Sequence, residues 1–335
     1  MQTEVLSIPS PLSFDELARR VVAGEELDRD SARAILGSSD DQLPELLAAA
    51  FRVREHFHGR RVKICQLHNA RSGQCAEDCH YCSQSAVSDA EIPRYRLDSA
   101  EELLRGARQA VAAGSRRYCM VASGRGPRAG DLERFTTATR AIKAEFPDLE
   151  ICVSLGIMSE ADARELKGAG VGWVNHNLNT SQRFHSEICT THTYEDRVST
   201  VRNVQRAGLN TCCGGIIGMG EDDEDVIDLA FSLRELKVTS LPLNFLIPFD
   251  GTPLAGKCEL TPGRSLRALC LMRLTSPEAE IRMAAGSEAV LGSFRALVLY
   301  PANSIFVDGY LTSPGQAHDE ARQMIESMGF EVESS

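Results

Sequence analysis

The chain has 335 residues, of which 43% are hydrophobic and 25% are charged, a composition that is typical of a globular protein and excludes a largely disordered one. It carries 36 Lys and Arg against 47 Asp and Glu, so its formal net charge is −11, which disfavours binding to nucleic acid or to an anionic membrane surface. No uncharged apolar run approaches the ~18 residues that a membrane span needs, and the N-terminus lacks the pattern of a secretion signal. We therefore expect a cytoplasmic protein whose eleven cysteines are metal ligands or core residues rather than disulfides.

Residues 1–60 have the pattern of helices. Ser13 and Glu16 have the spacing of a capping box, and Pro44 stands where a further helix would begin. No motif with catalytic chemistry occurs there. We predict an N-terminal helical extension that packs on the main domain.

From residue 61 onward, short apolar strands alternate with amphipathic helices. Asp98 is the expected N-terminal cap of the helix over 98–114, and Thr193 that of the helix over 193–208. Eight strands are predicted, at 62–67, 116–122, 149–155, 172–178, 210–218, 240–246, 279–285 and 302–308. Repeated βα units form a parallel sheet, and eight of them can close a barrel, so we predict an α/β protein with a (βα)8 TIM-type barrel over 61–320 and a tail over 321–335. An open doubly wound sheet is the alternative.

Three cysteines follow the first predicted strand with the spacing CxxxCxxC: Cys75, Cys79 and Cys82. In a barrel this loop lies at the C-terminal ends of the strands, where active sites form. Thiolates are soft ligands that suit an iron–sulfur cluster or zinc, and three of them on a four-iron cluster leave one iron open. The alternative is a structural zinc site with His80 as the fourth ligand.

Further polar and sulfur-bearing residues lie within the predicted strands. Asn175, Asn177 and Asn179 alternate along the fourth strand and would share one face; otherwise they are turn residues beyond its end. Separate strands carry Cys119, Cys152, Cys212 and Arg282. An arginine in an apolar strand is costly unless it meets an anion or a ligand, so three thiolates and one guanidinium pointing inward could hold a second cluster. Each cysteine taken alone is more simply a buried thiol.

Two features of the fifth strand leave alternatives open. Cys212 and Cys213 are neighbours, so only one can face the barrel interior of a regular strand. The glycines between Gly214 and Gly220 either allow an adenosine to approach the backbone or make a tight turn between strand and helix. The remaining cysteines, Cys65, Cys189, Cys258 and Cys270, are expected to be structural thiols.

The CxxxCxxC loop resembles that of radical S-adenosylmethionine enzymes, and Tyr81 matches their usual aromatic residue. Within that superfamily the longer runs resemble the biotin synthase family. They span roughly residues 61–316 and include SGQCAEDCHYCSQS, YCMVASGRGP, NHNLNTS, TTHTYEDR, GGIIGMGE, NFLIPFDGTPL, EIRMAAG and ANSIFVDGYLTSPGQ.

The resemblance implies the following site, which has no side chain acting as acid or base. Cys75, Cys79 and Cys82 would bind a 4Fe–4S cluster, and Cys119, Cys152, Cys212 and Arg282 an auxiliary 2Fe–2S cluster. Tyr81, Asn179 and Arg197 would contact S-adenosylmethionine, and Asn177, Asn244, Thr312 and Ser313 the substrate dethiobiotin. A 5′-deoxyadenosyl radical would abstract hydrogen from dethiobiotin, and the auxiliary cluster would donate the sulfur of biotin.

The resemblance also implies partners: a flavodoxin or ferredoxin reductant, an iron–sulfur assembly system and a second copy in a homodimer. This chain departs from the family pattern at Asn179, where some members have aspartate, at Cys213, where serine is usual, and at Ser287, where arginine is common. These departures leave the type of the auxiliary cluster open. The rival interpretations are another radical enzyme with this barrel, related to hydrogenase maturases or methylornithine synthase, and a metal-binding protein without enzymatic activity.

Overall fold

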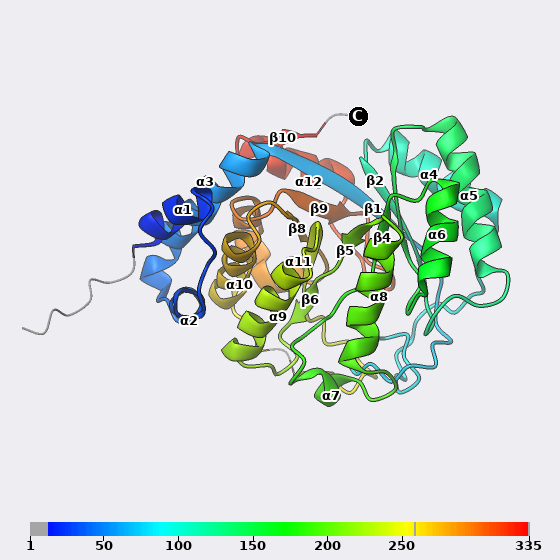
Figure 1. Ribbon diagram of the computed structural model, residues 1–335, viewed down its shortest axis with the longest axis horizontal. Coiled ribbons are helices and arrows are strands. Elements are labelled where there is room, and N and C mark those ends of the chain that lie inside the picture. Colours follow the sequence, from blue (N-terminus) through cyan, green and yellow to red (C-terminus); the bar gives the residue numbers. More distant parts are fainter. Residues whose placement is uncertain (1–12, 258, 334–335) are drawn as a thin grey trace, which may run out of the picture.

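The computed structural model describes residues 13–257 and 259–333. Parallel strands form a closed ring, in which β1 pairs with both β2 and β9 (Figure 1). The strands are β1 Arg61–Arg71, β2 Arg117–Ala122, β3 Glu150–Ser154, β4 Trp173–Asn175, β5 Asn210–Cys212, β6 Gly215–Ile217, β7 Ser240–Phe245, β8 Glu280–Met283, β9 Ser304–Val307 and β10 Glu331–Val332. The predicted (βα)8 barrel is confirmed.

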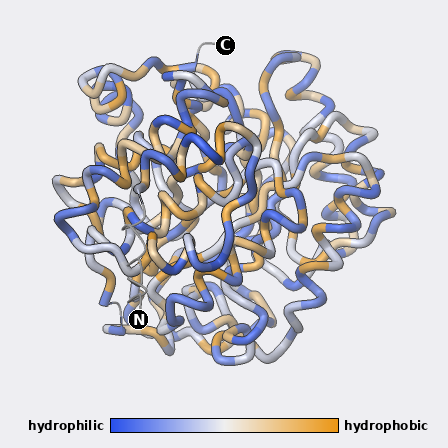
Figure 2. The backbone as a smooth tube through the Cα atoms, turned by 60° about the vertical axis from the view of Figure 1, so that its left-hand side comes forward, coloured by the Kyte–Doolittle hydropathy of each residue, from blue (hydrophilic) through white to orange (hydrophobic). Residues whose placement is uncertain are grey.

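Helices surround the ring (Figure 1). They are α1 Phe14–Val22, α2 Arg29–Leu36, η1 Asp40–Gln42, α3 Leu43–His58, α4 Ala100–Ala112, α5 Asp131–Glu145, α6 Glu160–Ala169, α7 His185–Ile188, α8 Tyr194–Arg206, α9 Asp223–Glu235, α10 Pro262–Thr275, α11 Ser287–Leu291, η2 Gly292–Leu299 and α12 His318–Ser327. Hydrophobic and hydrophilic stretches alternate along the chain, as amphipathic helices on a buried barrel require (Figure 2). Within the described residues, no helix combines the length and the apolar character needed to cross a membrane.

The fifth predicted strand is divided in two, which corrects the single strand expected over 210–218. The break falls between β5 and β6, opposite Pro242 of β7. Proline has no N–H to donate to the ladder. A Cβ on Gly214 would lie 1.8 Å from the carbonyl oxygen of Pro242, so the chain can approach β7 this closely only with glycine at that position.

The helix caps confirm one expectation and correct another. Thr193 caps α8 and accepts a hydrogen bond from the backbone of Asp196. Ser99, rather than Asp98, caps α4. The carboxylate of Asp98 lies 2.7 Å from Nε2 of His68 on β1, a long-range contact that the sequence pattern does not reveal.

The N-terminal helices pack on one side of the barrel, next to α9 and α10 (Figure 1). Their buried apolar residues belong to the same core as those of α10. Ser13 caps α1 and Pro44 opens α3, as predicted. Arg29 of α2 also forms ion pairs with Glu224 and Asp228 of α9.

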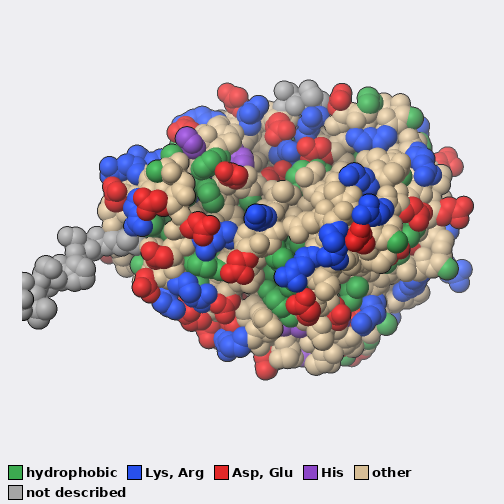
Figure 3. Space-filling model, viewed as in Figure 1, with side chains coloured by type: hydrophobic (Ala, Val, Ile, Leu, Met, Phe, Trp, Pro, Cys, Tyr) green, Lys and Arg blue, Asp and Glu red, His purple; other side chains and the backbone are tan. Residues whose placement is uncertain are grey.

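At the other end of the chain, α12 leads into β10, which pairs with the first residues of β1 (Figure 1). Cys258, one of the expected structural thiols, lies outside the described residues. On the face that Figure 3 shows, basic and acidic side chains are interspersed, so no field of one sign covers it.

A charged network fills the bottom of the barrel interior. The fully buried Arg117 donates to Glu280 through both terminal nitrogens, at 2.9 and 3.0 Å, and stacks 3.8 Å from the ring centroid of Trp173. Lys63 lies 2.9 Å from Glu150 and 3.3 Å from Glu280. Glu280 also accepts from Arg282 of its own strand. Each buried charge is thus paired, which offsets the cost of its desolvation.

We predict that Glu280→Gln lowers the free energy of unfolding by about 3 kcal/mol, because it leaves Arg117 and Arg282 buried without their shared carboxylate. Denaturant unfolding of the reconstituted protein measures the loss. The control is Glu145→Gln, which breaks an exposed ion pair with Arg108 and should lower the free energy of unfolding far less than Glu280→Gln. Equal losses in the two variants would contradict this role of Glu280.

Candidate active site

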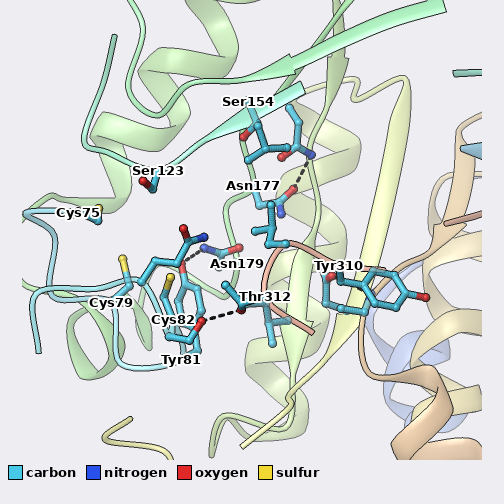
Figure 4. Close-up of a pocket in the computed structure, with 18 of the residues that line it drawn as sticks. Cys75, Cys79, Tyr81, Cys82, Ser123, Ser154, Asn177, Asn179, Tyr310 and Thr312 are labelled. Atoms are coloured by element: carbon cyan, nitrogen blue, oxygen red, sulfur yellow. Dashed lines mark hydrogen bonds between the residues drawn. The ribbon is translucent and has the colours of Figure 1, made fainter. Parts of the chain in front are cut away.

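A cavity of about 360 Å³ opens at the C-terminal ends of the strands. Its wall combines the cysteine loop after β1, the residues that follow β2 to β4, and the loop after β9 (Figure 4). Most of the predicted site residues line it: Cys75, Cys79, Tyr81, Cys82, Cys119, Asn177, Asn179, Arg197, Asn244, Thr312 and Ser313. Cys152, Cys212 and Arg282 lie in the barrel interior and do not line it. The cavity therefore leads from the cysteine loop toward the interior of the barrel.

The three motif cysteines share one side of the cavity (Figure 4). Cys79 is buried, whereas Cys75 and Cys82 are half-buried. Burial raises the pKa of the Cys82 thiol to about 11. The pKa of Cys79 is also raised, first by its hydrogen bond to Cys189 and then by burial. The thiols of Cys79 and Cys82 are therefore protonated when no metal is bound. Binding of a metal centre would release their protons.

The geometry disfavours the alternative of one zinc ion held by the motif. Among the described residues, one group of three metal-ligating side chains has its ligand atoms all within 4.8 Å of one another, and it consists of Cys79, Cys189 and His192. Cys75, Cys82 and His80 are not part of it. Sulfurs that do not converge on one point suit ligands to different irons of a cluster.

The segment 189–192 holds the cysteine loop in place. The Sγ atoms of Cys79 and Cys189 are 3.7 Å apart. Asp78 accepts hydrogen bonds from the backbone and hydroxyl groups of Thr190 and Thr191. Nδ1 of His192 contacts the carboxylate of Glu77, the residue that precedes Asp78 in the cysteine loop. Sequence reasoning missed this clamp, because the two segments lie more than a hundred positions apart.

Three residues predicted to contact the cofactor lie together beside the cysteines. Asn179 donates to the hydroxyl of Tyr81 (Figure 4), and Nη2 of Arg197 lies 3.4 Å from that hydroxyl. Nη1 of Arg197 donates to the carbonyl oxygen of Asn177 at 2.8 Å. Nε of Arg197 is buried and has no hydrogen-bond partner. A buried donor of this kind needs an acceptor, and a polar ligand in the cavity would supply one.

The residues predicted to contact the substrate differ in how free their polar groups are. Each polar end of the Asn244 amide makes one hydrogen bond to the backbone: Nδ2 donates to Gly215 and Oδ1 accepts from Ala285, both at 3.1 Å. One N–H and one acceptor site of the amide are left over. Oδ1 of Asn177 accepts from the backbone of Gly214 at 3.0 Å. Asn177 and Asn179 lie beyond the end of β4, as in the turn alternative, and still line the cavity.

The loop after β9 brings hydroxyl groups to the part of the wall that adjoins the cysteine motif. Thr312 lies 2.8 Å from the hydroxyl of Ser83, next to the cysteine motif. Ser313 donates to the carbonyl oxygen of Tyr310 at 3.2 Å. The contact between Ser83 and Thr312 joins the loops that follow two neighbouring strands, since Ser83 follows β1 and Thr312 follows β9.

A layer of thiols lies at the inner end of the cavity, where Cys119 lines the wall and Cys152 and Cys212 lie deeper. Cys119 of β2 and Cys152 of β3 are paired in register, and Arg282 of β8 donates to the sulfur of Cys212 at 3.3 Å. All four residues are buried. A hydrogen bond from Cys152 lowers the pKa of the Cys212 thiol against the effect of its burial, and the charge of Arg282 lowers it further. The tertiary structure thus brings together the four residues that the sequence placed on separate strands.

The structure distinguishes the neighbouring cysteines of the fifth strand. Cys212 belongs to the interior group with Cys119 and Cys152, whereas Cys213 packs in the core between barrel and helices. Asn175 donates to the Cys212 sulfur at 3.3 Å, a contact that sequence reasoning did not anticipate.

Two other open points are also answered. Gly218 and Gly220 have φ values of 101° and 110° between β6 and α9, which favours the interpretation of a tight turn between strand and helix. A Cβ on Gly214 or Gly215 would collide with β7 or α9, so these two glycines allow close packing of the strand. Ser287 is buried and accepts a hydrogen bond from Nε of Arg295 at 2.9 Å. A guanidinium from η2 therefore lies against the position at which the family commonly has arginine.

Several residues of the cavity wall were not singled out from the sequence. Ser123 follows β2, Ser154 is the last residue of β3, and Tyr310 follows β9 (Figure 4). Their position at or near the C-terminal end of a predicted strand was the available signal, because residues there face the active site of a βα barrel.

Comparisons with known families and with known proteins agree on the family to which the chain is similar. Residues 70–233 match the Radical SAM superfamily, and residues 242–331 match the Biotin and Thiamin Synthesis associated domain. The chain is 48% identical to a biotin synthase of Bacillus subtilis over 95% of this chain and 95% of that protein. It is 46% identical to biotin synthase 2 of Frankia casuarinae, over 96% and 89%.

Solved structures agree on the fold. Methylornithine synthase superimposes with a TM-score of 0.82 at 22% identity, covering 95% of this chain and 97% of the other. The hydrogenase maturase HydG superimposes with a TM-score of 0.80 at 15% identity, covering 95% and 75%. At these identities the likeness concerns the fold alone.

Proposed function

The chain belongs to the biotin synthase family of radical S-adenosylmethionine enzymes, and on that basis we propose that it converts dethiobiotin to biotin by inserting sulfur. The observation that carries the proposal is one continuous arrangement. A loop with three cysteines borders the cavity, and three thiols with a guanidinium lie at its inner end.

Sulfur insertion at an unactivated C–H bond exceeds what side-chain acids, bases and nucleophiles can do, so cofactors must supply the difficult step. A 4Fe–4S cluster with S-adenosylmethionine supplies a 5′-deoxyadenosyl radical for hydrogen abstraction, and an auxiliary 2Fe–2S cluster supplies sulfur. The residues fit these groups: the motif thiols do not converge on a single ion, and the buried Nε of Arg197 lacks an acceptor.

We assign binding and orientation to the residues around the cavity. Cys75, Cys79 and Cys82 hold the 4Fe–4S cluster. Tyr81, Asn179 and Arg197 form the contiguous polar group beside it and orient S-adenosylmethionine. The walls exclude water, which protects a reactive radical from side reactions.

The substrate-facing residues are proposed from the same wall. Thr312 and Ser313 present hydroxyl groups that suit the carboxylate of dethiobiotin. Asn177 and Asn244 suit its ureido ring. The backbone contacts of Asn244 fix the orientation of its amide, and the remaining N–H and acceptor site can face the substrate.

The auxiliary 2Fe–2S cluster is assigned to Cys119, Cys152, Cys212 and Arg282. The direct contact between Arg282 and Cys212 supports the assignment, as does the register between Cys119 and Cys152. The position of these four residues deeper in the barrel than the cysteine loop matters for the reaction, because the substrate must lie between the source of the radical and the source of sulfur.

The proposed partners follow from this chemistry. The reaction needs a low-potential electron donor such as flavodoxin or ferredoxin, and the clusters need an iron–sulfur assembly system. A homodimer is proposed from the family. The proposed location is a reducing cytoplasm, where cysteine side chains stay reduced and available as cluster ligands.

The test is anaerobic reconstitution followed by Mössbauer spectroscopy and an assay with dethiobiotin, S-adenosylmethionine and a chemical reductant. We expect about six irons per chain, in one four-iron and one two-iron cluster, together with 5′-deoxyadenosine and biotin. Zinc in place of iron would refute the proposal. Cleavage of S-adenosylmethionine with a single cluster and no biotin would indicate another radical enzyme of this fold.

We predict that Asn179→Asp tightens the binding of S-adenosylmethionine roughly fivefold, because a carboxylate can accept from two ribose hydroxyls and charged hydrogen bonds are stronger by about 1 kcal/mol. Equilibrium dialysis of the reconstituted protein measures the Kd. Asn175→Asp is the control, since Asn175 lines the same cavity but its Nδ2 donates to Asn177 and Cys212 and not to Tyr81. Unchanged or weaker binding in Asn179→Asp would remove Asn179 from the ribose contact.

A further inference from the structure

One thiol in the barrel interior has no role in the proposed chemistry. Cys65 of β1 was expected to be a structural thiol. It is fully buried, and it packs in the same group as Cys119, Cys152 and Cys212. The interior layer therefore contains four thiols, one more than the family pattern requires.

The direction of Cys65 follows from the alternation along β1. Lys63, two residues before it, forms ion pairs with Glu150 and Glu280 in the barrel interior. Leu67, two residues after it, lines the cavity. Since residues two apart in a strand share a face, Cys65 points into the interior between these two levels.

Cys65 is connected to Arg282 through one hydroxyl group. The Oγ atom of Ser304 lies 3.5 Å from Sγ of Cys65 and 3.0 Å from Nε of Arg282. On its other side, Nη1 of Arg282 lies 3.3 Å from Sγ of Cys212. The guanidinium is thus placed between a thiol already assigned to the auxiliary cluster and a thiol that has no assigned role.

We propose that Cys65 is a reserve ligand of the auxiliary cluster, able to take the iron position of Arg282. This inference rests on the proposed function. In the exchange, the iron–nitrogen bond to Arg282 breaks and an iron–sulfur bond to Cys65 forms, while the thiol proton passes to the guanidine. A thiolate is the softer ligand and the better one for an iron–sulfur centre. Cys65 therefore retains the cluster when Arg282 is absent or displaced.

The experiment compares the iron and sulfide content and the Mössbauer spectrum of full-length variants after anaerobic reconstitution. Arg282→Ala and Cys65→Ser should each keep about six irons per chain, whereas the double variant should fall to about four, with loss of the two-iron signal. Cys213→Ser combined with Arg282→Ala is the matched control. Cys213 is an equally buried barrel thiol, but it faces the outer core, so this pair should keep about six irons.

Two results would overturn the inference: loss of the auxiliary irons in Arg282→Ala alone, or their retention in the double variant with Cys65→Ser. Failure of the proposed function gives a different result, since the unmodified protein would then lack the two-iron cluster. Four irons retained in the double variant show that it folds. Arg282→Gln, which keeps more side-chain volume, allows the same comparison if Arg282→Ala does not fold.

Discussion

Replacing Cys152 with alanine is expected to leave reductive cleavage of S-adenosylmethionine intact while biotin formation falls more than about 100-fold, beyond the loss typical of residues that only support metal ligands. Cys152 is paired in register with Cys119 and packs in the same interior group as Cys119 and Cys212. It does not line the cavity, and the motif cysteines are unaffected by its removal. The radical would therefore form, but the sulfur source would be lost.

Three measurements on Cys152→Ala separate these effects. 5′-Deoxyadenosine reports cleavage, biotin reports sulfur insertion, and the absorbance of the auxiliary cluster reports its presence. Cys270→Ala serves as the control, because Cys270 is a buried thiol of α10 in the core between helices and barrel. A normal yield of biotin from Cys152→Ala would remove these thiols from the role of sulfur donor.

Cys79→Ala should abolish both products, with 5′-deoxyadenosine reduced by more than about 1,000-fold, because the step that generates the radical depends on the cofactors that the loop binds. Cys79 is the most buried of the three motif thiols and lies against Arg197 and Cys189. Iron content and 5′-deoxyadenosine are the measurements.

Cys189→Ser is the matched control for Cys79→Ala, since the two sulfurs are 3.7 Å apart. It removes a thiol at the same place and keeps a hydrogen-bonding group of similar size. We expect it to retain the four-iron cluster and cleavage. If Cys79→Ala kept its activity and Cys189→Ser lost it, Cys189 rather than Cys79 would be the ligand.

The local features were predictable because they depend on residues close in sequence. The CxxxCxxC loop, the cap at Thr193 and the alternation of strands and helices all follow from short-range spacing, and the structure contains each of them. The split of the fifth strand was not predictable in the same way. It results from Pro242, a residue of the neighbouring strand that the local pattern of 210–218 does not include.

The contacts between segment 189–192 and the cysteine loop were not predictable from local sequence either. Asp78 and Thr190 belong to segments that meet only when the chain after β4 returns to the mouth of the barrel. Asn244 shows the reverse case: its position was predicted, but only the fold reveals that backbone groups fix the orientation of its amide.

The local pattern of residues predicts repeated βα units, the cysteine loop and the candidates for an interior set of thiols, since strand alternation dictates which side chains share a face. Which of the interior candidates meet depends on how the strands pair. Strand register places Cys119 beside Cys152, turns Cys212 inward and Cys213 outward, and adds Cys65 to the layer. Register depends on pairing between distant strands, so no local pattern of residues contains it.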